Sequence, residues 1–90
     1  MKIEKNKIVY EEDGKEIGLV EFKEIDDDTL DICHTYVDPD YQGRKIASQL
    51  VETLFKKLKK ENKKVVITCS YVVKWIQKHP EYRENVINEL

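Results

Sequence analysis

Hydrophobic and polar residues alternate along the first half of the chain in a pattern that predicts β-strands. Three runs rich in β-branched and aromatic residues cover positions 8–10, 17–22 and 30–37. Charged segments separate them, and the first segment has Asp13-Gly14 at its centre, which is a strong signal for a tight turn. Such short connections favour an antiparallel meander of three strands.

The third run alternates strictly between two faces of the predicted sheet. Leu30, Ile32, His34 and Tyr36 fall on one face, so His34 is expected to share a side with apolar residues. Neighbouring residues on a strand point in opposite directions, so Cys33 is expected to face away from His34, and we assign it no role. Asp38-Pro39-Asp40 ends the strand, because proline cannot donate to a sheet.

A helical repeat follows this strand. Ile46, Leu50, Leu54 and Leu58 recur every four residues, and lysines and Glu52 occupy the opposite side. The spacing predicts an amphipathic helix that lies on the sheet.

The last third of the chain adds a strand and a second helix. Residues 64–68 predict a short buried strand, and the order strand, helix, strand makes it parallel to the third strand. Residues 71–78 fit a helix that Pro80 ends, and Tyr82, Val86 and Leu90 indicate one more short helical segment. The predicted fold class is α/β, with three antiparallel strands, one parallel strand, two main helices and a short C-terminal helical segment.

Length and composition narrow the possible classes of protein. A chain of 90 residues with 40% hydrophobic content closes one core, so we expect a single domain over residues 1–90. Its 16 basic and 18 acidic residues nearly balance, which argues against binding to nucleic acid through phosphates. No stretch is apolar enough for a signal peptide or a bilayer span, so we expect a cytoplasmic protein without a membrane partner.

The two cysteines lie far apart in the sequence. Cys33 and Cys69 show none of the close spacing of a metal knuckle or a redox pair, so we expect free thiols and no metal site.

The stretch from Gln42 to Ala47 is the best candidate for chemistry. It joins a strand to the first turn of a helix, where backbone N–H groups without intrahelical partners and the helix dipole favour an anion such as pyrophosphate. Gly43 lets the backbone approach a phosphate closely, and Arg44 and Lys45 add positive charge. A glycine at such a junction is also compatible with a simple turn, so the motif alone leaves both interpretations open.

Residues 37–50, Val-Asp-Pro-Asp-Tyr-Gln-Gly-Arg-Lys-Ile-Ala-Ser-Gln-Leu, resemble the acetyl-CoA signature of the GNAT acetyltransferase superfamily, Gln/Arg-x-x-Gly-x-Gly/Ala. His34-Thr35, Cys69 and the sequence His-Pro-Glu-Tyr at 79–82 are similar to landmarks of small single-domain GNAT-like proteins. Two positions depart from the pattern. Lys45 replaces the usual second glycine, and Ser70 stands where proline is expected, but neither change removes a backbone donor.

The resemblance implies that the chain binds acetyl-CoA or CoA and transfers an acetyl group to an amine. It places the pantetheine arm between the third and fourth strands, which splay apart, with the pyrophosphate at residues 42–48 and the thioester near His34 and Cys69. The residues expected to bind the cofactor are Tyr36, Val37, Gln42, Gly43, Arg44, Lys45, Ile46, Ala47, Ser48, Tyr71 and Lys74.

Two mechanisms fit these residues. In the first, which we favour, the amine attacks the thioester directly, His34 takes up a proton and Cys69 only lines the site. In the second, Cys69 accepts the acetyl group first, and His34 lowers the pKa of its thiol. A small buried residue is the competing interpretation of Cys69, and His79, before Pro80, is expected to be structural.

The acceptor site is expected to be open and shallow. The segments that build the acceptor pocket in larger members of the superfamily are missing, which suits a protein lysine or a polyamine as the unknown amine acceptor. Another subunit could complete the pocket, so we expect a monomer or a weak homodimer. The rival hypotheses are a CoA-binding module with little catalysis and a protein-interaction domain that has lost the ligand.

Overall fold

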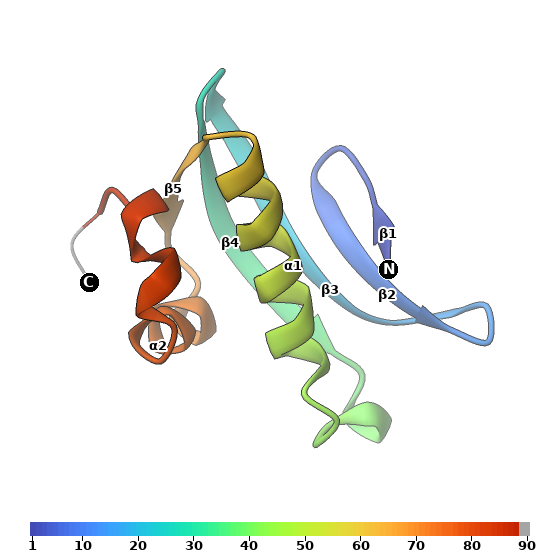
Figure 1. Ribbon diagram of the computed structural model, residues 1–90. Helices are drawn as coiled ribbons and strands as arrows, with labels where there is room; N and C mark the ends of the chain where they lie inside the picture. Colours follow the sequence, from blue (N-terminus) through green and yellow to red (C-terminus); the bar gives the residue numbers. More distant parts are fainter. Residues whose placement is uncertain (89–90) are drawn as a thin grey trace.

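A computed structural model of the chain describes residues 1–88 (Figure 1). The order of the predicted elements is confirmed. Most boundaries shift by one or two residues, and β3 extends four residues beyond the predicted run 17–22. Leu90, which the sequence pattern included in the last helical segment, lies outside the described residues. The elements are β1 (Lys2–Ile3), β2 (Lys7–Glu12), β3 (Lys15–Asp26), β4 (Thr29–Val37), the 3₁₀ helix η1 (Pro39–Tyr41), α1 (Ile46–Lys60), β5 (Lys64–Ile67), α2 (Ser70–Gln77) and the 3₁₀ helix η2 (Pro80–Asn85).

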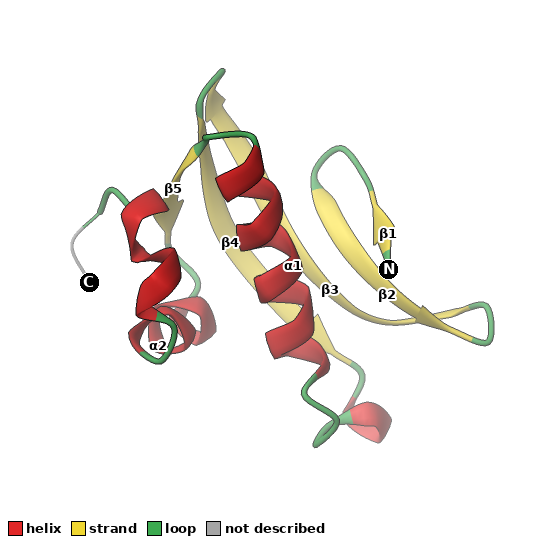
Figure 2. Ribbon diagram, viewed as in Figure 1, coloured by secondary structure: helices red, strands yellow, loops and turns green. Residues whose placement is uncertain are grey.

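The strands form one sheet in the order β1-β2-β3-β4-β5 (Figure 2). The first four are antiparallel neighbours, and β5 pairs parallel with β4, from Thr29 opposite Lys64 to Ile32 opposite Ile67. The α/β class and the parallel last strand are therefore confirmed. The sequence predicted four strands, because β1 has two residues and is too short to show a period.

The helices pack together on one face of the sheet. Phe55 of α1 stacks on Trp75 of α2 with ring centroids 5.5 Å apart, and both belong to the same buried cluster as the sheet residues. Gly18 of β3 allows a close approach, since a Cβ there would lie 3.0 Å from Ile46 Cγ2. Within residues 1–88, no helix combines the length and the apolar composition needed to cross a bilayer.

A β-bulge in β4 overturns the predicted alternation of its side chains. His34 is the partner of Glu21, but Ile32 is the partner of the next residue, Phe22, so Cys33 is an extra residue in the strand. Thr35 pairs with buried Val20 and therefore faces the helices. His34 is exposed on the uncovered face instead of sharing a side with Ile32. The alternation that predicted Cys33 and His34 on opposite faces of the sheet does not apply across this bulge.

The C-terminal segment lies along the outer edge of β5. Val86 forms an isolated parallel bridge with Val65, and the Ile87 N–H donates to the Val65 carbonyl at 3.0 Å. The Asn88 side-chain amide accepts from the Ile67 N–H at 3.0 Å and donates to its carbonyl at 2.9 Å. The outer edge of β5 is thus paired, whereas the inner edge of β4 beyond Ile32 is not.

Candidate functional site

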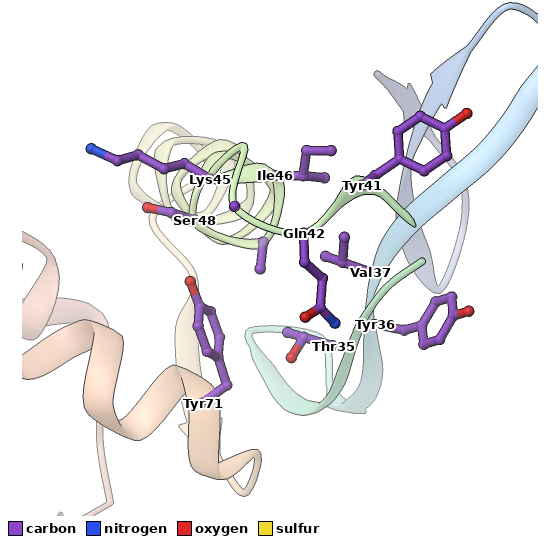
Figure 3. Close-up of a pocket in the computed structure, with 11 residues that line it drawn as sticks. Thr35, Tyr36, Val37, Tyr41, Gln42, Lys45, Ile46, Ser48 and Tyr71 are labelled. Atoms are coloured by element: carbon purple, nitrogen blue, oxygen red, sulfur yellow. The ribbon is translucent and has the colours of Figure 1, made fainter. Parts of the chain in front are cut away.

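A cavity of about 390 Å³ lies where β4, the loop that follows it, α1 and α2 meet. Figure 3 shows side chains from all of these elements around it. No carboxylate is among its lining residues, which are Thr35, Tyr36, Val37, Tyr41, Gln42, Gly43, Lys45, Ile46, Ala47, Ser48 and Tyr71. The structure therefore gathers nine of the eleven predicted cofactor residues around one space, together with Thr35 and Tyr41.

One wall of the cavity is the free edge of β4. The pairing of β4 with β5 ends at Ile32, whose carbonyl accepts from the N–H groups of Thr68 and Cys69 as the chain turns into α2. The Asp38 N–H donates to the Ile17 carbonyl of β3 at 2.7 Å. Peptide groups alternate in direction along a strand, so those of Thr35 and Val37 face away from β3. Within residues 1–88 they meet no strand there, which leaves hydrogen-bonding groups for a ligand.

The opposite wall is the start of α1. Gly43 has φ of +87° and Lys45 has φ of +58°, and this loop turns the chain sharply into the helix. The first intrahelical hydrogen bond runs from the Gln49 N–H to the Lys45 carbonyl at 3.1 Å. The N–H groups of residues 46–48 precede it and have no intrahelical acceptor. Without an acidic residue in the first turn, this end of α1 suits an anion.

The first turn of α2 closes the third side. The Trp75 indole N–H donates to Ser48 Oγ at 2.9 Å and links the two helices. Figure 3 shows Tyr71 reaching from α2 toward Ser48 at the start of α1. Burial, and to a lesser degree the nearby Cys69, raise the pKa of Tyr71. Its hydroxyl group therefore stays neutral at physiological pH and can donate a hydrogen bond.

Two predicted cofactor residues lie outside this cavity. The guanidinium of Arg44 donates from both Nη atoms to the carboxylate of Glu12, at 2.8 and 2.9 Å, and Arg44 does not line the cavity. This bidentate pair holds the β2–β3 hairpin against the loop. Lys74 lines a second cavity, of about 480 Å³, that shares Lys45, Ser48 and Tyr71 with the first.

The predicted meeting of His34 and Cys69 does not occur. Thr35 takes that place, with its Oγ1 3.6 Å from Cys69 Sγ, while His34 lies on the other face of the sheet. The cause is the bulge, which inverts the orientation of every residue after Ile32 relative to strict alternation. The sequence marked Thr35 only as the neighbour of His34 in a family landmark, because the bulge that turns Thr35 toward Cys69 depends on the pairing with β3. His79 has the expected structural position, with Nδ1 2.8 Å from the Trp75 carbonyl oxygen.

Tyr41 was also missed, although it lies within the motif that the sequence singled out. Its ring is flanked by the cationic groups of Lys15 and Arg44, each 5.6 Å from the ring centroid. An aromatic residue beside the glycine of the loop was the available signal.

Comparison with known proteins identifies the family. Residues 7–86 match the family described as GCN5-related N-acetyl-transferase. Protein NATD1 of Danio rerio is 34% identical over 62 residues, which cover 67% of this chain and 56% of that relative. This chain therefore spans little more than half the length of the curated relative.

Solved structures share the fold. A GCN5-like protein from Staphylococcus aureus superposes with a TM-score of 0.78 at 18% identity, over 99% of this chain and 88% of its own. The PaiA N-acetyltransferase of Thermoplasma acidophilum, in complex with coenzyme A, superposes with a TM-score of 0.63 at 21% identity, over 82% of this chain and 50% of its own. Because the family match also includes every residue that lines the first cavity, this chain belongs to the GCN5-related N-acetyltransferase family.

Proposed function

We propose that this chain binds acetyl-CoA in the first cavity and transfers its acetyl group to an amine. The observation that carries the proposal is that one cavity joins the free edge of β4 to the anion-binding start of α1. Family membership supports the same ligand, as does the coenzyme A bound to the PaiA protein.

The residues around the cavity fit the parts of the cofactor. The N–H groups of residues 46–48 and the loop at Gly43 suit a pyrophosphate, and no lining carboxylate repels it. The peptide groups of Thr35 and Val37 suit the amides of the pantetheine arm, which can pair with them as an added strand would. When bound, acetyl-CoA supplies an acetyl group activated as a thioester.

The acceptor is proposed to approach from the uncovered face of the sheet. His34 lies there, next to Thr35 in the strand and opposite Glu21 on β3. An imidazole can take up a proton at neutral pH, and the carboxylate of Glu21 favours a cationic amine nearby. Within residues 1–88 no helix covers this face, which suits a lysine side chain of a protein or a polyamine.

Direct transfer to the amine fits the site better than an acyl-cysteine intermediate. Cys69 is the N-cap residue of α2, a position that can favour a thiolate, but a cysteine nucleophile also needs an adjacent base to take up its proton. The polar neighbour of Cys69 Sγ is the hydroxyl of Thr35, and His34 is on the other face. We therefore assign Cys69 to the wall of the cavity near the thioester.

Binding can be tested by calorimetric titration of acetyl-CoA with a matched pair of variants. Gly43 and Gly14 both have positive φ and both have open space where a Cβ would lie, so a tryptophan strains the backbone similarly at each. The loop and helix start at residues 42–48, where the pyrophosphate is proposed to bind, are called the cradle. Gly43→Trp should weaken binding by about 100-fold or more because the side chain fills the cradle, whereas Gly14→Trp should bind as the wild type does. Absence of wild-type binding at millimolar acetyl-CoA would contradict the proposal.

Transfer is tested separately, by following release of the CoA thiol in the presence of a lysine-containing peptide or spermidine. A general base contributes about 100-fold or more, so His34→Gln should lower the rate by that factor. If acetyl-CoA binds and no thiol is released above the uncatalysed rate, the chain is a CoA-binding module and the catalytic part of the proposal is wrong.

A further inference from the structure

The second cavity extends the first along α2. Lys45, Ser48 and Tyr71 line both, so the two cavities lie side by side at the start of α1. The other side chains of the second cavity come from α2 and the residues just after it, namely Lys74, Trp75, Lys78 and His79. A ligand whose pyrophosphate occupies the start of α1 can therefore continue into this second space.

The charge of the second cavity is uniformly positive. Lys45, Lys74 and Lys78 line it, and no carboxylate does. Within residues 1–88 none of these three lysines has a carboxylate oxygen within 4.0 Å, whereas Lys57, Lys59 and four other cationic residues do have one. This set of three uncompensated lysines is called the basic cleft below.

The fold does not require this arrangement of charge. Lys74 and Lys78 are four residues apart on one helix face, a spacing at which like charges destabilise a helix. The end of α2 accounts for positive charge at Lys74 and Lys78, because cations are favoured near a helix C-terminus, but not for Lys45, which comes from the loop before α1. An anion bound between the two elements would relieve the repulsion.

The wall of the cleft is aromatic and rigid. His79 stacks on Trp75 with ring centroids 3.8 Å apart and an interplanar angle of 10°. The hydrogen bonds from Trp75 to Ser48 and between His79 and the Trp75 carbonyl fix both rings. Because Trp75 is buried, this pair gives the cleft a fixed wall from which Lys74 and Lys78 extend.

We infer that the basic cleft binds the 3′-phosphate on the ribose of coenzyme A. This inference rests on the proposed function. In coenzyme A the ribose is joined to the pyrophosphate through its 5′ carbon, so the 3′-phosphate must lie within a few bonds of the cradle. A phosphate monoester carries a charge of about −1.5 to −2 at pH 7, which the three lysines match. The cleft therefore makes the chain selective for coenzyme A over dephospho-CoA, which differs only by that phosphate.

The test is calorimetric titration of the wild-type chain with coenzyme A and with dephospho-CoA. Coenzyme A should bind about tenfold more tightly at low salt, and the ratio should shrink as salt screens these exposed charges. Lys74→Gln and Lys78→Gln should each lower the ratio of the two affinities toward one. The control is Lys23→Gln, because Lys23 is exposed on β3 away from both cavities and should leave the ratio unchanged.

The outcomes separate this inference from the proposed function. Equal affinities for the two ligands in the wild-type chain would overturn the basic cleft and leave acetyl-CoA binding in place. A tenfold ratio that survives in both lysine variants would also overturn it, because the 3′-phosphate would then lie elsewhere. Failure of both ligands to bind at millimolar concentration would overturn the proposed function itself, and the inference with it.

Discussion

Lys45 combines an unfavourable backbone conformation with a position between the two cavities. Its φ of +58° lies in the left-handed region, which a residue with a Cβ adopts at a cost of about 1 kcal/mol or more. The superfamily pattern that the sequence resembles has glycine at this position, and glycine adopts this conformation freely. The lysine therefore places a positive charge beside the cradle and lowers the free energy of unfolding relative to glycine.

Replacing this residue should separate the two effects. Lys45→Gly should raise the free energy of unfolding by about 0.5–1 kcal/mol, the relieved strain less the added entropy of an unfolded glycine. The same change should weaken coenzyme A binding, because a charge beside the phosphates is lost. Urea denaturation and calorimetric titration measure the two quantities.

Asn62→Gly is the matched control for Lys45→Gly. Asn62 also has a positive φ, of +55°, but it lies after the far end of α1, and asparagine tolerates this region. Its replacement should change neither stability by much nor ligand binding. A Lys45→Gly variant that binds coenzyme A as tightly as the wild type does would show that the lysine side chain has no role in the site.

The sequence revealed most of the cavity residues but not the faces of the sheet on which Thr35 and His34 lie. Gln42, Gly43 and Ala47 could be predicted because a local turn followed by a helix positions them. Thr35 and His34 could not, because their faces depend on the single extra residue that β4 carries opposite Glu21. Strict alternation is the only guide that an isolated strand sequence offers, and it fails across a bulge.

At the level of the elements, one ion pair connects the β2–β3 hairpin to the loop before α1. Glu12 ends β2 and Arg44 lies in the loop, 32 residues away. The hydrogen bond from Arg44 lowers the pKa of the Glu12 carboxyl below its ordinary value of 4.5. The pair holds the Arg44 guanidinium on Glu12, beside the ring of Tyr41.

The stabilisation from this pair should depend on pH with a defined sign. Because the pKa of Glu12 is lower in the folded chain, the stabilisation is present above the unfolded pKa and is lost as the pH falls through the folded one. Glu12→Gln should therefore be less stable than the wild type in urea at pH 7, and the difference should disappear in acid, below pH 4.5. Because the pair is exposed, the difference should also shrink in high salt.

Glu11→Gln is the control for this pH dependence, since Glu11 is the exposed neighbour and forms no ion pair within residues 1–88. A difference between Glu12→Gln and the wild type that persists unchanged at low pH would contradict the electrostatic origin of the effect.

Among the elements, length decided what the sequence could predict. The four-residue repeat of α1 extends over several turns, so its existence and buried stripe were predictable. β1 has two residues and forms only because Lys2 and Ile3 can pair with Val9 and Ile8 on β2. Such a pairing has no local pattern and depends on the rest of the sheet.

At the level of the whole molecule, the sheet separates two environments. The helices lie on one face (Figure 2). The two neighbouring cavities are at the start of α1 on that side. His34 and Glu21 lie on the other face, which no described helix covers. The cofactor and the acceptor are thereby proposed to meet at β4 from opposite sides.

Hydrogen exchange of backbone amides, followed by NMR with and without acetyl-CoA, tests this arrangement most directly. Saturating acetyl-CoA should slow exchange at Thr35, Val37 and residues 46–48, whose N–H groups have no backbone acceptor among residues 1–88. The amides of the β2–β3 hairpin should exchange at unchanged rates. Protection of the hairpin without protection of residues 46–48, or no change at millimolar acetyl-CoA, would contradict the assignment of the cavity as the acetyl-CoA site.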